Sequence, residues 1–299
     1  MLTLYPDRCI HAMSRSSSPA ARAASGDTVC FHTLDCFSGQ LTREDQLLGG
    51  LDWDTINPAT GPLYVEGAEA GDVLKVEILS IETASQGVMV DGPGEGAVGP
   101  QLAEERTKVL QIQDGVVRFS DRLSFPIRPM IGVIGVAPAA EDIPTNTPGA
   151  HGGNMDCTRI GAGATLYLPV NVPGALLAMG DLHAIMGDGE VGVCGVEVAG
   201  VVTVRVTALK ACALPTPFLV MDDAFMTICS AETADEAGDS AILAMHTFLT
   251  GELGMDPHEA NMLMSVCGDL RVCQVVDPEK TFRLEMPIRV AQAHGYTFR

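Results

Sequence analysis

The chain has 299 residues and a formal net charge of −20 at pH 7, with 38 Asp and Glu against 18 Lys and Arg. This balance argues against nucleic acids and anionic membranes as partners, because both are bound through clustered basic side chains. A hydrophobic content of 46% excludes a mainly disordered chain and is sufficient for a large core.

The location expected from the sequence is the cytoplasm. No run of apolar residues approaches the roughly eighteen that a membrane-spanning helix needs, and the first residues lack the apolar segment of a secretion signal. The nine cysteines are scattered and include no C-x-x-C pair. This pattern argues against a zinc ribbon and favours free thiols in a reducing compartment.

Most of the chain is predicted to form short strands. Residues 72–83, for example, alternate apolar and polar side chains, as expected of a strand with one buried face. Gly and Pro separate such segments at intervals of about ten residues, a spacing typical of β-sandwiches and barrels. The strands expected, in chain order, are 27–37, 72–83, 116–120, 129–138, 164–170, 191–200 and 201–209.

The last part of the chain has a different pattern. Residues 230–251 carry apolar side chains near helical spacing. Residues 256–267 begin with Asp256 as a helix cap and Pro257 at the first helical position. Residues 269–278 are expected to return to a strand. The sequence therefore predicts a mainly β body, like a sandwich or a barrel, with a smaller C-terminal α+β part.

Two segments are candidate boundaries between parts of the chain. Residues 96–115 form a polar stretch, and Pro215–Pro217 is rich in proline. We therefore expect a β-rich N-terminal part (1–100), a β-rich central part (101–215) and an α+β C-terminal part (216–299).

Residues 151–190 hold an unusual concentration of acids and imidazoles between glycines. Solvated surface segments usually mix acids with several bases, but here Arg159 is the only basic side chain apart from histidine. Such a set is typical of side chains that converge on a metal or a polar substrate. Its members are His151, Asn154, Asp156, Asp181, His183, Asp188 and Glu190.

The spacing within this block suggests how its side chains meet. Asp181 and His183 are two residues apart, as are Asp188 and Glu190. On a strand such pairs point to the same face, so a turn at Gly187 would bring the two pairs together. The alternatives are a solvent-facing turn at Asp188, a turn-capping carboxylate at Asp181 and a hydrogen-bonded core histidine at His183.

Other candidates lie outside this block. Asp35 interrupts the apolar segment TLDCF, and a buried acid there must be paired or bound to a metal. Glu69 lies in a turn before a predicted strand. Cys36 and Cys157 each follow an Asp and could act as nucleophiles. Nitrilase-type amidases also require a Lys beside the cysteine, and no Lys accompanies either of these residues.

Four longer motifs extend over almost the whole chain: GPLYVEGAEAGD (61–72), PTNTPGAHGGNMD (144–156), GATLYLPVNVPGALLAMGDLHAIMGDGEV (163–191) and GDLRVCQVVDP (268–278). Together they resemble the acetamidase/formamidase family. The resemblance implies a mostly β fold, hydrolysis of short aliphatic amides to the acid and ammonia, homodimers or larger homo-oligomers, and often a bound divalent metal. One position departs from the family pattern, since Met186 stands where a Gln is common.

We therefore expect a metal-assisted amidohydrolase that cleaves a small amide such as acetamide or formamide. The expected metal ligands are His183, Asp156, Glu190 and Asp35, the expected catalytic residues are Asp35, Asp156 and Glu69, and the expected substrate-binding residues are Asn154, His151 and Met186. A histidine ligand favours Zn²⁺, whereas an all-oxygen set favours Ca²⁺. The alternatives are a non-catalytic β-rich binding protein with a structural Ca²⁺ and an amidase with a cysteine nucleophile.

Overall fold

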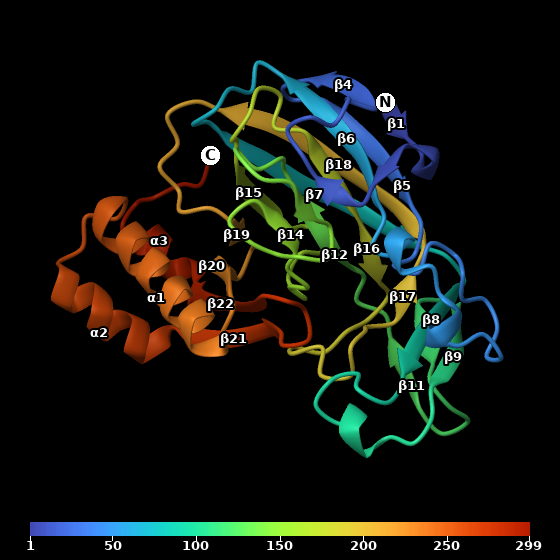
Figure 1. The fold of residues 1–299 in the computed structure, drawn as a ribbon. Coiled ribbons are helices and arrows are strands. Elements are labelled where there is room, and N and C mark those ends of the chain that lie inside the picture. Colours follow the sequence, from blue (N-terminus) through green and yellow to red (C-terminus); the bar gives the residue numbers. More distant parts are fainter.

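The alternating segment that begins at Val73 forms the longest strand, β7 (Val73–Thr83), in the middle of a nine-stranded sheet (Figure 1). The computed structural model describes residues 1–299. In spatial order the sheet consists of β1 (Leu2–Leu4), β5 (Thr28–Thr33), β18 (Gly200–Leu209), β7, β15 (Thr165–Pro169), β19 (Phe218–Val220), β20 (Ala224–Ala231), β22 (Lys280–Pro287) and β21 (Asp269–Gln274).

A second, eleven-stranded sheet carries most of the acid and histidine block. Its main path is β11 (Ser124–Pro126), β10 (Val116–Arg118), β9 (Arg106–Gln113), β8 (Gln86–Asp91), β17 (Glu197–Val198), β16 (Leu177–His183), β12 (Met130–Gly135) and β14 (Gly152–Asn154). Strand β6 (Ala59–Glu66) pairs with β16, and β2 (Cys9–Ile10) and β4 (Ala21–Ala24) pair with β6. A separate pair is formed by β3 (Ala12–Met13) and β13 (Ile143–Pro144), and the short 3-10 helices are Pro6–Arg8, Leu48–Gly50, Trp53–Thr55 and Gly99–Gln101.

The main core lies between these two sheets. Its cluster of 38 buried residues takes Leu74 and Val204 from the nine-stranded sheet and Ile131 and Met179 from the eleven-stranded sheet. Burial of one such side chain stabilises the fold by about 1.5–3 kcal/mol. Every residue of β16 is buried. The polar side chains of Asp181 and His183, at the end of this strand, therefore lie in the interior and need partners.

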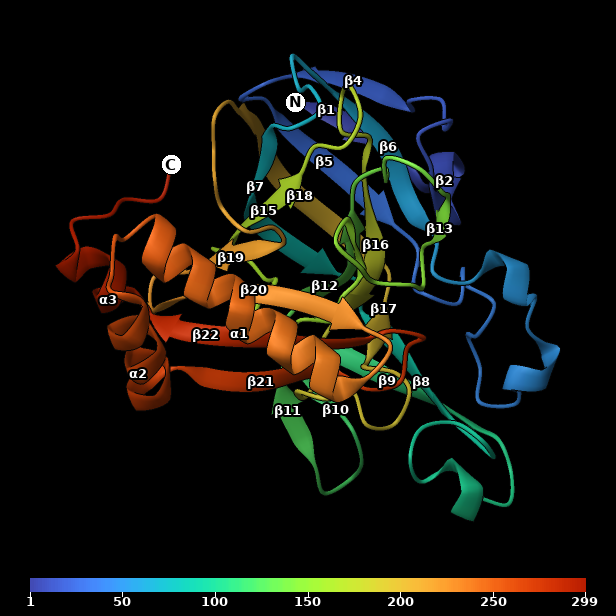
Figure 2. The same cartoon turned by 60° about the vertical axis from the view of Figure 1, so that its left-hand side comes forward.

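The C-terminal part adds helices to one end of the nine-stranded sheet. These are α1 (Ala234–Gly251), α2 (Pro257–Cys267) and α3 (Ile288–Ala293), and α1 packs across β20 and β22 (Figure 2). Thr233 and Glu236 form a reciprocal capping box at the start of α1. The stacked rings of Phe218 and Phe225 pack against Phe248 of α1 and attach the helix to the sheet.

The predicted fold class, mainly β with a smaller C-terminal α+β part, is confirmed, and the sheets do not close into a barrel. Asp256 caps α2 as expected, since its carboxylate accepts hydrogen bonds from the amides of His258 and Glu259. Both sheets combine strands from distant parts of the chain. In the nine-stranded sheet β7 pairs with β15 and β18, and in the eleven-stranded sheet β16 pairs with β6.

The strand predicted over 191–200 is mostly wrong. Only Glu197–Val198 forms a strand before β18 begins at Gly200, and the segment from Val191 is a turn. Val191 is 69% exposed and Val193 has a φ of 77°, so the apolar pattern here does not reflect a buried, extended backbone. This turn instead positions Glu190 and Cys194 at a cavity.

All nine cysteines are free thiols in the structure. None of the three helices has the length and apolar character needed to cross a membrane.

Candidate active site

The imidazole of His183, at the end of β16, is surrounded by carboxylates. Its Nε2 lies 3.0 Å from Glu197 Oε1 and 3.5 Å from Asp181 Oδ1. The same nitrogen lies 3.9 Å from Asp156 Oδ1 and 3.9 Å from Glu190 Oε1. All five residues are at most 7% exposed, so the sequence folds a group of acids around one buried histidine.

Backbone conformation aims three of these carboxylates at one point. Asp156, Asp181 and Glu190 have φ values of 44°, 52° and 45°, in the left-handed region that non-glycine residues seldom adopt. Such residues cost roughly 1–3 kcal/mol each and persist where the surrounding structure holds them. Gly132 on β12 leaves the necessary space, because a Cβ there would lie 2.5 Å from Asp156 Oδ1 and 2.6 Å from Asp181 Oδ2.

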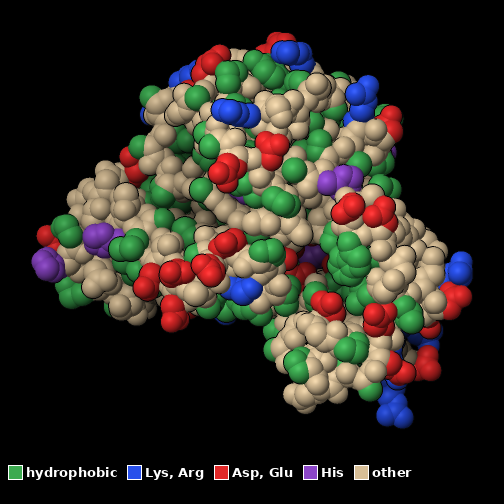
Figure 3. Space-filling view, in the orientation of Figure 1, with side chains coloured by type: hydrophobic (Ala, Val, Ile, Leu, Met, Phe, Trp, Pro, Cys, Tyr) green, Lys and Arg blue, Asp and Glu red, His purple; other side chains and the backbone are tan.

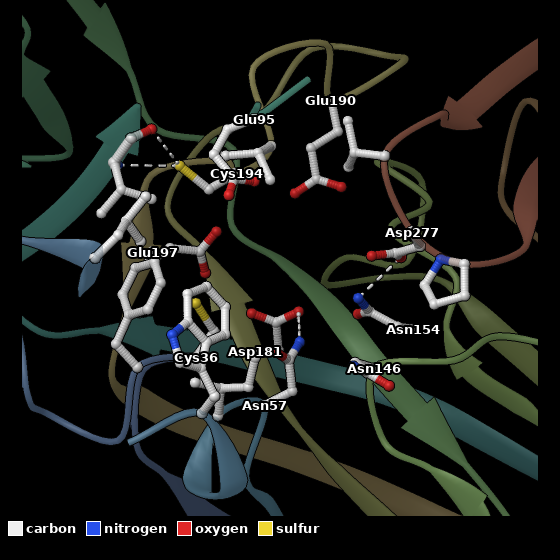
Figure 4. Close-up of a pocket in the computed structure, with 18 residues that line it drawn as sticks. Cys36, Asn57, Glu95, Asn146, Asn154, Asp181, Glu190, Cys194, Glu197 and Asp277 are labelled. Carbon is white, nitrogen blue, oxygen red and sulfur yellow. Dashed lines mark hydrogen bonds between the residues drawn. The ribbon is translucent and has the colours of Figure 1, made fainter. Parts of the chain in front are cut away.

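The cluster adjoins a cavity of about 210 Å³ (Figure 4). Asp181, Glu190 and Glu197 line it, together with Asn154 and Asp277, and no Lys or Arg does. Figure 3 shows acidic side chains around a hollow on this face of the molecule. The apolar part of the lining is formed by Phe37, Leu48, Trp53, Ile56, Val90, Val193, Val276 and Pro278. A small cavity with an acidic side and an apolar side suits a small polar molecule with a short apolar group.

Burial and mutual repulsion govern the ionisation of the acids. Burial, with nearby carboxylates, holds the pKa values of Asp156 and Glu190 well above their usual range. Burial also raises the pKa of Glu197 to about 7, although His183 opposes the shift. Burial alone would lower the pKa of His183, but Glu197 and Asp181 raise it well above its ordinary value.

These groups fit a divalent cation. Both oxygens of Asp156, one oxygen of Glu190 and both ring nitrogens of His183 are buried without a hydrogen bond of acceptable geometry. Buried polar atoms without partners are costly, and a bound cation would offset that cost. Ligand atoms of Asp156, His183 and Glu190 lie within 4.8 Å of one another, and carboxylate oxygen with imidazole nitrogen is a common donor set for Zn²⁺.

The C-terminal α+β part contributes Asp277, which the sequence analysis did not single out. Asn154 Nδ2 donates a hydrogen bond to Asp277 Oδ2 at 2.9 Å, while Asn154 Oδ1 is buried without a partner. The amides of Val276 and Asp277 both donate to Gln274 Oε1 at 3.0 Å, which fixes the turn after β21. The strand predicted over 269–278 therefore ends at Gln274, and Asp277 reaches the cavity because the chain turns there.

Glu197 is the second residue that the sequence analysis missed, because it lies inside an apolar run. A lone carboxylate in a buried strand was an available signal, by the argument applied to Asp35. Asp35 itself is placed elsewhere: its Oδ1 accepts hydrogen bonds from the amides of Phe37 and Gly39, both at 3.0 Å. Backbone amides thus satisfy this carboxylate, and it is not in the ligand cluster.

The expected common direction of Asp188 and Glu190 is wrong. Arg283 binds both oxygens of Asp188, at 3.0 and 2.7 Å, and Thr158 Oγ1 donates to Asp188 at 2.6 Å. The left-handed backbone of Glu190 breaks the alternation that a strand would give, so only Glu190 reaches the cluster. The Asp188–Arg283 pair ties the turn before Glu190 to β22.

Three further candidates are not brought to this site. Glu69 is exposed in the turn between β6 and β7. Met186 lines a different cavity of about 520 Å³, which shares Glu190 and Cys194 with the first. His151 is buried but does not line the active-site cavity, because its ring is held against the backbone of neighbouring glycines. Glu69, Met186 and His151 therefore lie outside the lining of this cavity.

The chain matches the model of the Acetamidase/Formamidase family over residues 16–147 and 139–292. It belongs to the acetamidase/formamidase family. Among solved structures of the family, the acetamidase from Bacillus halodurans is 49% identical, with a TM-score of 0.97 over 98% of this chain and 100% of that chain. A predicted acetamidase/formamidase from Thermoanaerobacter tengcongensis is 45% identical, with a TM-score of 0.97 over 99% of each chain.

Curated members of the family are more distant. The formamidase of Methylophilus methylotrophus is 26% identical over 249 residues, which are 64% of this chain. The chain spans 61% of the length of that formamidase and 60% of the length of a second relative, from Schizosaccharomyces pombe. The family thus includes both chains of this length and longer ones.

Proposed function

We propose that this protein hydrolyses short aliphatic amides to the carboxylate and ammonia with the help of a divalent metal. The observation that carries the proposal is the buried group of carboxylates around His183, several of whose oxygens lack hydrogen-bond partners, beside a cavity of about 210 Å³. The full-length similarity to a protein named as an acetamidase supports the same reaction. An amide needs an activated nucleophile, stabilisation of the oxyanion and a proton donor for the leaving nitrogen.

Asp156, His183 and Glu190 are the residues that we assign to hold the metal. A bound divalent ion supplies a Lewis acid for the carbonyl and lowers the pKa of water. The imidazole nitrogen favours Zn²⁺ over Ca²⁺. Asp35 is no longer proposed as a ligand, because its carboxylate accepts two backbone hydrogen bonds.

The remaining polar residues orient the substrate and move the proton. Asn154 Oδ1 is free to accept a hydrogen bond from the amide nitrogen of the substrate, since its Nδ2 already binds Asp277. Asp277 lines the same cavity, and we assign it the proton transfer to the departing ammonia. The apolar wall around Phe37 and Val90 would hold the acyl group.

A cysteine nucleophile remains the second candidate, because Cys36 lines the cavity. No Lys lines that cavity to complete a nitrilase-type set. Cys157 is not in the lining and packs near Cys273 and Arg283.

The test is ammonia release from amides with one to four carbons, measured before and after treatment with a chelator. We expect turnover of at least one amide, its loss in the metal-free protein, and recovery with Zn²⁺ or Mn²⁺. No ammonia from any amide would contradict the proposed activity. Full activity in protein shown to be metal-free would contradict the metal mechanism and favour Cys36.

A further inference from the structure

A second group of possible ligands lies beside the first and contains a thiol. Cys36 Sγ and one carboxylate oxygen each from Asp181 and Glu197 lie within 4.8 Å of one another. These residues are 6%, 2% and 2% exposed, so none of them is solvated. The group shares no residue with Asp156, His183 and Glu190, and Figure 4 shows Cys36, Asp181 and Glu197 on the same side of the cavity.

Each carboxylate of this second group is anchored through one oxygen and free at the other. Asp181 Oδ2 accepts a hydrogen bond from Asn57 Nδ2 at 3.4 Å, while Asp181 Oδ1 has no hydrogen-bond partner. Glu197 Oε1 accepts from the amide of Gly195 at 3.0 Å, while Glu197 Oε2 has none. Carboxylates that bind a metal usually accept a hydrogen bond from a neighbouring group at one oxygen, while the other oxygen binds the metal.

The thiol is also held in place by its backbone. The carbonyl of Cys36 accepts a hydrogen bond from the amide of Asn57 at 2.7 Å. The residue before it, Asp35, accepts hydrogen bonds from the amides of Phe37 and Gly39, which follow Cys36 in the chain. This turn fixes Cys36 next to the acids and gives the half-buried carboxylate of Asp35 a positioning role.

Charge supports more than one cation at this place. Four carboxylates surround His183, and Asp277 and Glu95 add two more at the cavity, yet no Lys or Arg lines it. One divalent ion offsets only part of that charge if the acids are ionised. Uncompensated buried charges are strongly destabilising.

We propose a second divalent-cation position, held by the thiolate of Cys36 and the carboxylates of Asp181 and Glu197, next to the first position. On binding, a metal–sulfur bond replaces the bond between sulfur and hydrogen, the proton leaves to solvent and no electron is transferred. A thiolate ligand selects thiophilic ions such as Zn²⁺, Co²⁺ or Cd²⁺ and disfavours Ca²⁺. The inference deepens the proposed function, because paired metal ions can stabilise both the attacking and the leaving atoms.

The experiment uses Co²⁺ as the probe. Chelator-treated full-length protein is loaded with Co²⁺, freed of excess ion, and studied by elemental analysis and by absorption in the near ultraviolet. We expect two cobalt ions per chain and a thiolate-to-cobalt charge-transfer band. Cys36→Ser should lose the band and one of the two ions.

Cys194→Ser is the matched control. Cys194 lines the same cavity, but its Sγ contacts the backbone of Val90 and belongs to neither ligand group. The band should survive in this variant. Glu197→Gln is a second probe that leaves the thiol in place, and it should also reduce binding to one cobalt ion. Thermal unfolding of each variant establishes that the protein is folded.

A single cobalt ion per wild-type chain, with or without the band, overturns the second position. Two ions without the band, or a band that persists in Cys36→Ser, overturns the role of the thiolate. These readouts do not depend on turnover. Amide hydrolysis with one bound ion would support the proposed function and refute the second metal position. Two bound ions without any hydrolysis would support the second metal position and refute the proposed function.

Discussion

The end of strand β16 and the glycine-rich loop 149–153 each carry a buried histidine, and they place it in opposite surroundings. His183 Nε2 has four carboxylate oxygens within 3.9 Å. His151 lies between Gly149 and Gly153, where an added Cβ would be 3.2 Å from its Nδ1 and 3.0 Å from its Nε2. Both rings lack hydrogen bonds. A histidine that is buried in an acid-rich segment is therefore not a candidate metal ligand for that reason alone. Carboxylates must also surround its ring, as they surround His183.

The same substitution at the two histidines gives the largest expected contrast. His183→Asn should cut the rate of amide hydrolysis at least about 100-fold and lower the metal content, because it removes one member of a cooperating set. If His183 were only a core residue, the folded variant would keep its metal and its rate and lose roughly 1–3 kcal/mol of stability. Elemental analysis, melting temperature and turnover of this variant distinguish the two cases.

Asp277→Asn tests whether the C-terminal part of the chain contributes a proton-transferring group or only a wall of the cavity. We expect about a 100-fold loss of rate, within the usual contribution of a positioned proton donor, with the metal content unchanged. The side chain keeps its size and can still pair with Asn154. Loss of metal in this variant would instead make Asp277 a ligand and remove the assigned proton transfer.

Gly132→Ala should have a smaller effect by displacing the acids at His183. The new Cβ would lie under 3 Å from the carboxylates of Asp156 and Asp181, so both must move. We expect about a tenfold loss of rate, because small displacements of catalytic groups are costly. Gly187→Ala is the matched control, since its Cβ would meet nothing within 4 Å. Equal rates for both variants would show that the position of these carboxylates is not critical.

The sequence could predict the part of the site that lies within one short segment. Asp156, His183 and Glu190 all belong to the block 151–190, and the structure brings them together. Glu197 was marked in the sequence only by its lone charge in an apolar run, and strand pairing places it opposite His183. Asp277 was missed because it reaches the site through the turn after β21, which spacing along the chain does not reveal. The strands expected at 72–83, 164–170 and 201–209 coincide with β7, β15 and β18, but β16, β20 and β22 were not among those expected. The strand expected from Val191 is a turn, since Val191 is exposed and Val193 has a left-handed backbone.

The smallest effect on rate is expected at His151, and it sharpens the comparison through pH. Burial lowers the pKa of His151 to about 4 from the ordinary value of 6.5. Between these values the unfolded chain binds a proton at this histidine and the folded chain does not, so the free energy of unfolding falls as the pH drops from 6.5 towards 4. Above pH 6.5 the ring is neutral in both states and has no such effect.

His151→Asn removes this proton linkage and should leave turnover and metal content near the wild-type values at pH 7. The difference in unfolding free energy between wild type and variant should shift by up to about 3 kcal/mol between pH 7 and pH 4, in favour of the variant at low pH. Denaturant unfolding of both proteins across this range measures it, and groups that titrate equally in the two proteins cancel in the difference. A constant difference, or a large loss of turnover at pH 7, would show that His151 is not the isolated neutral histidine that its surroundings indicate.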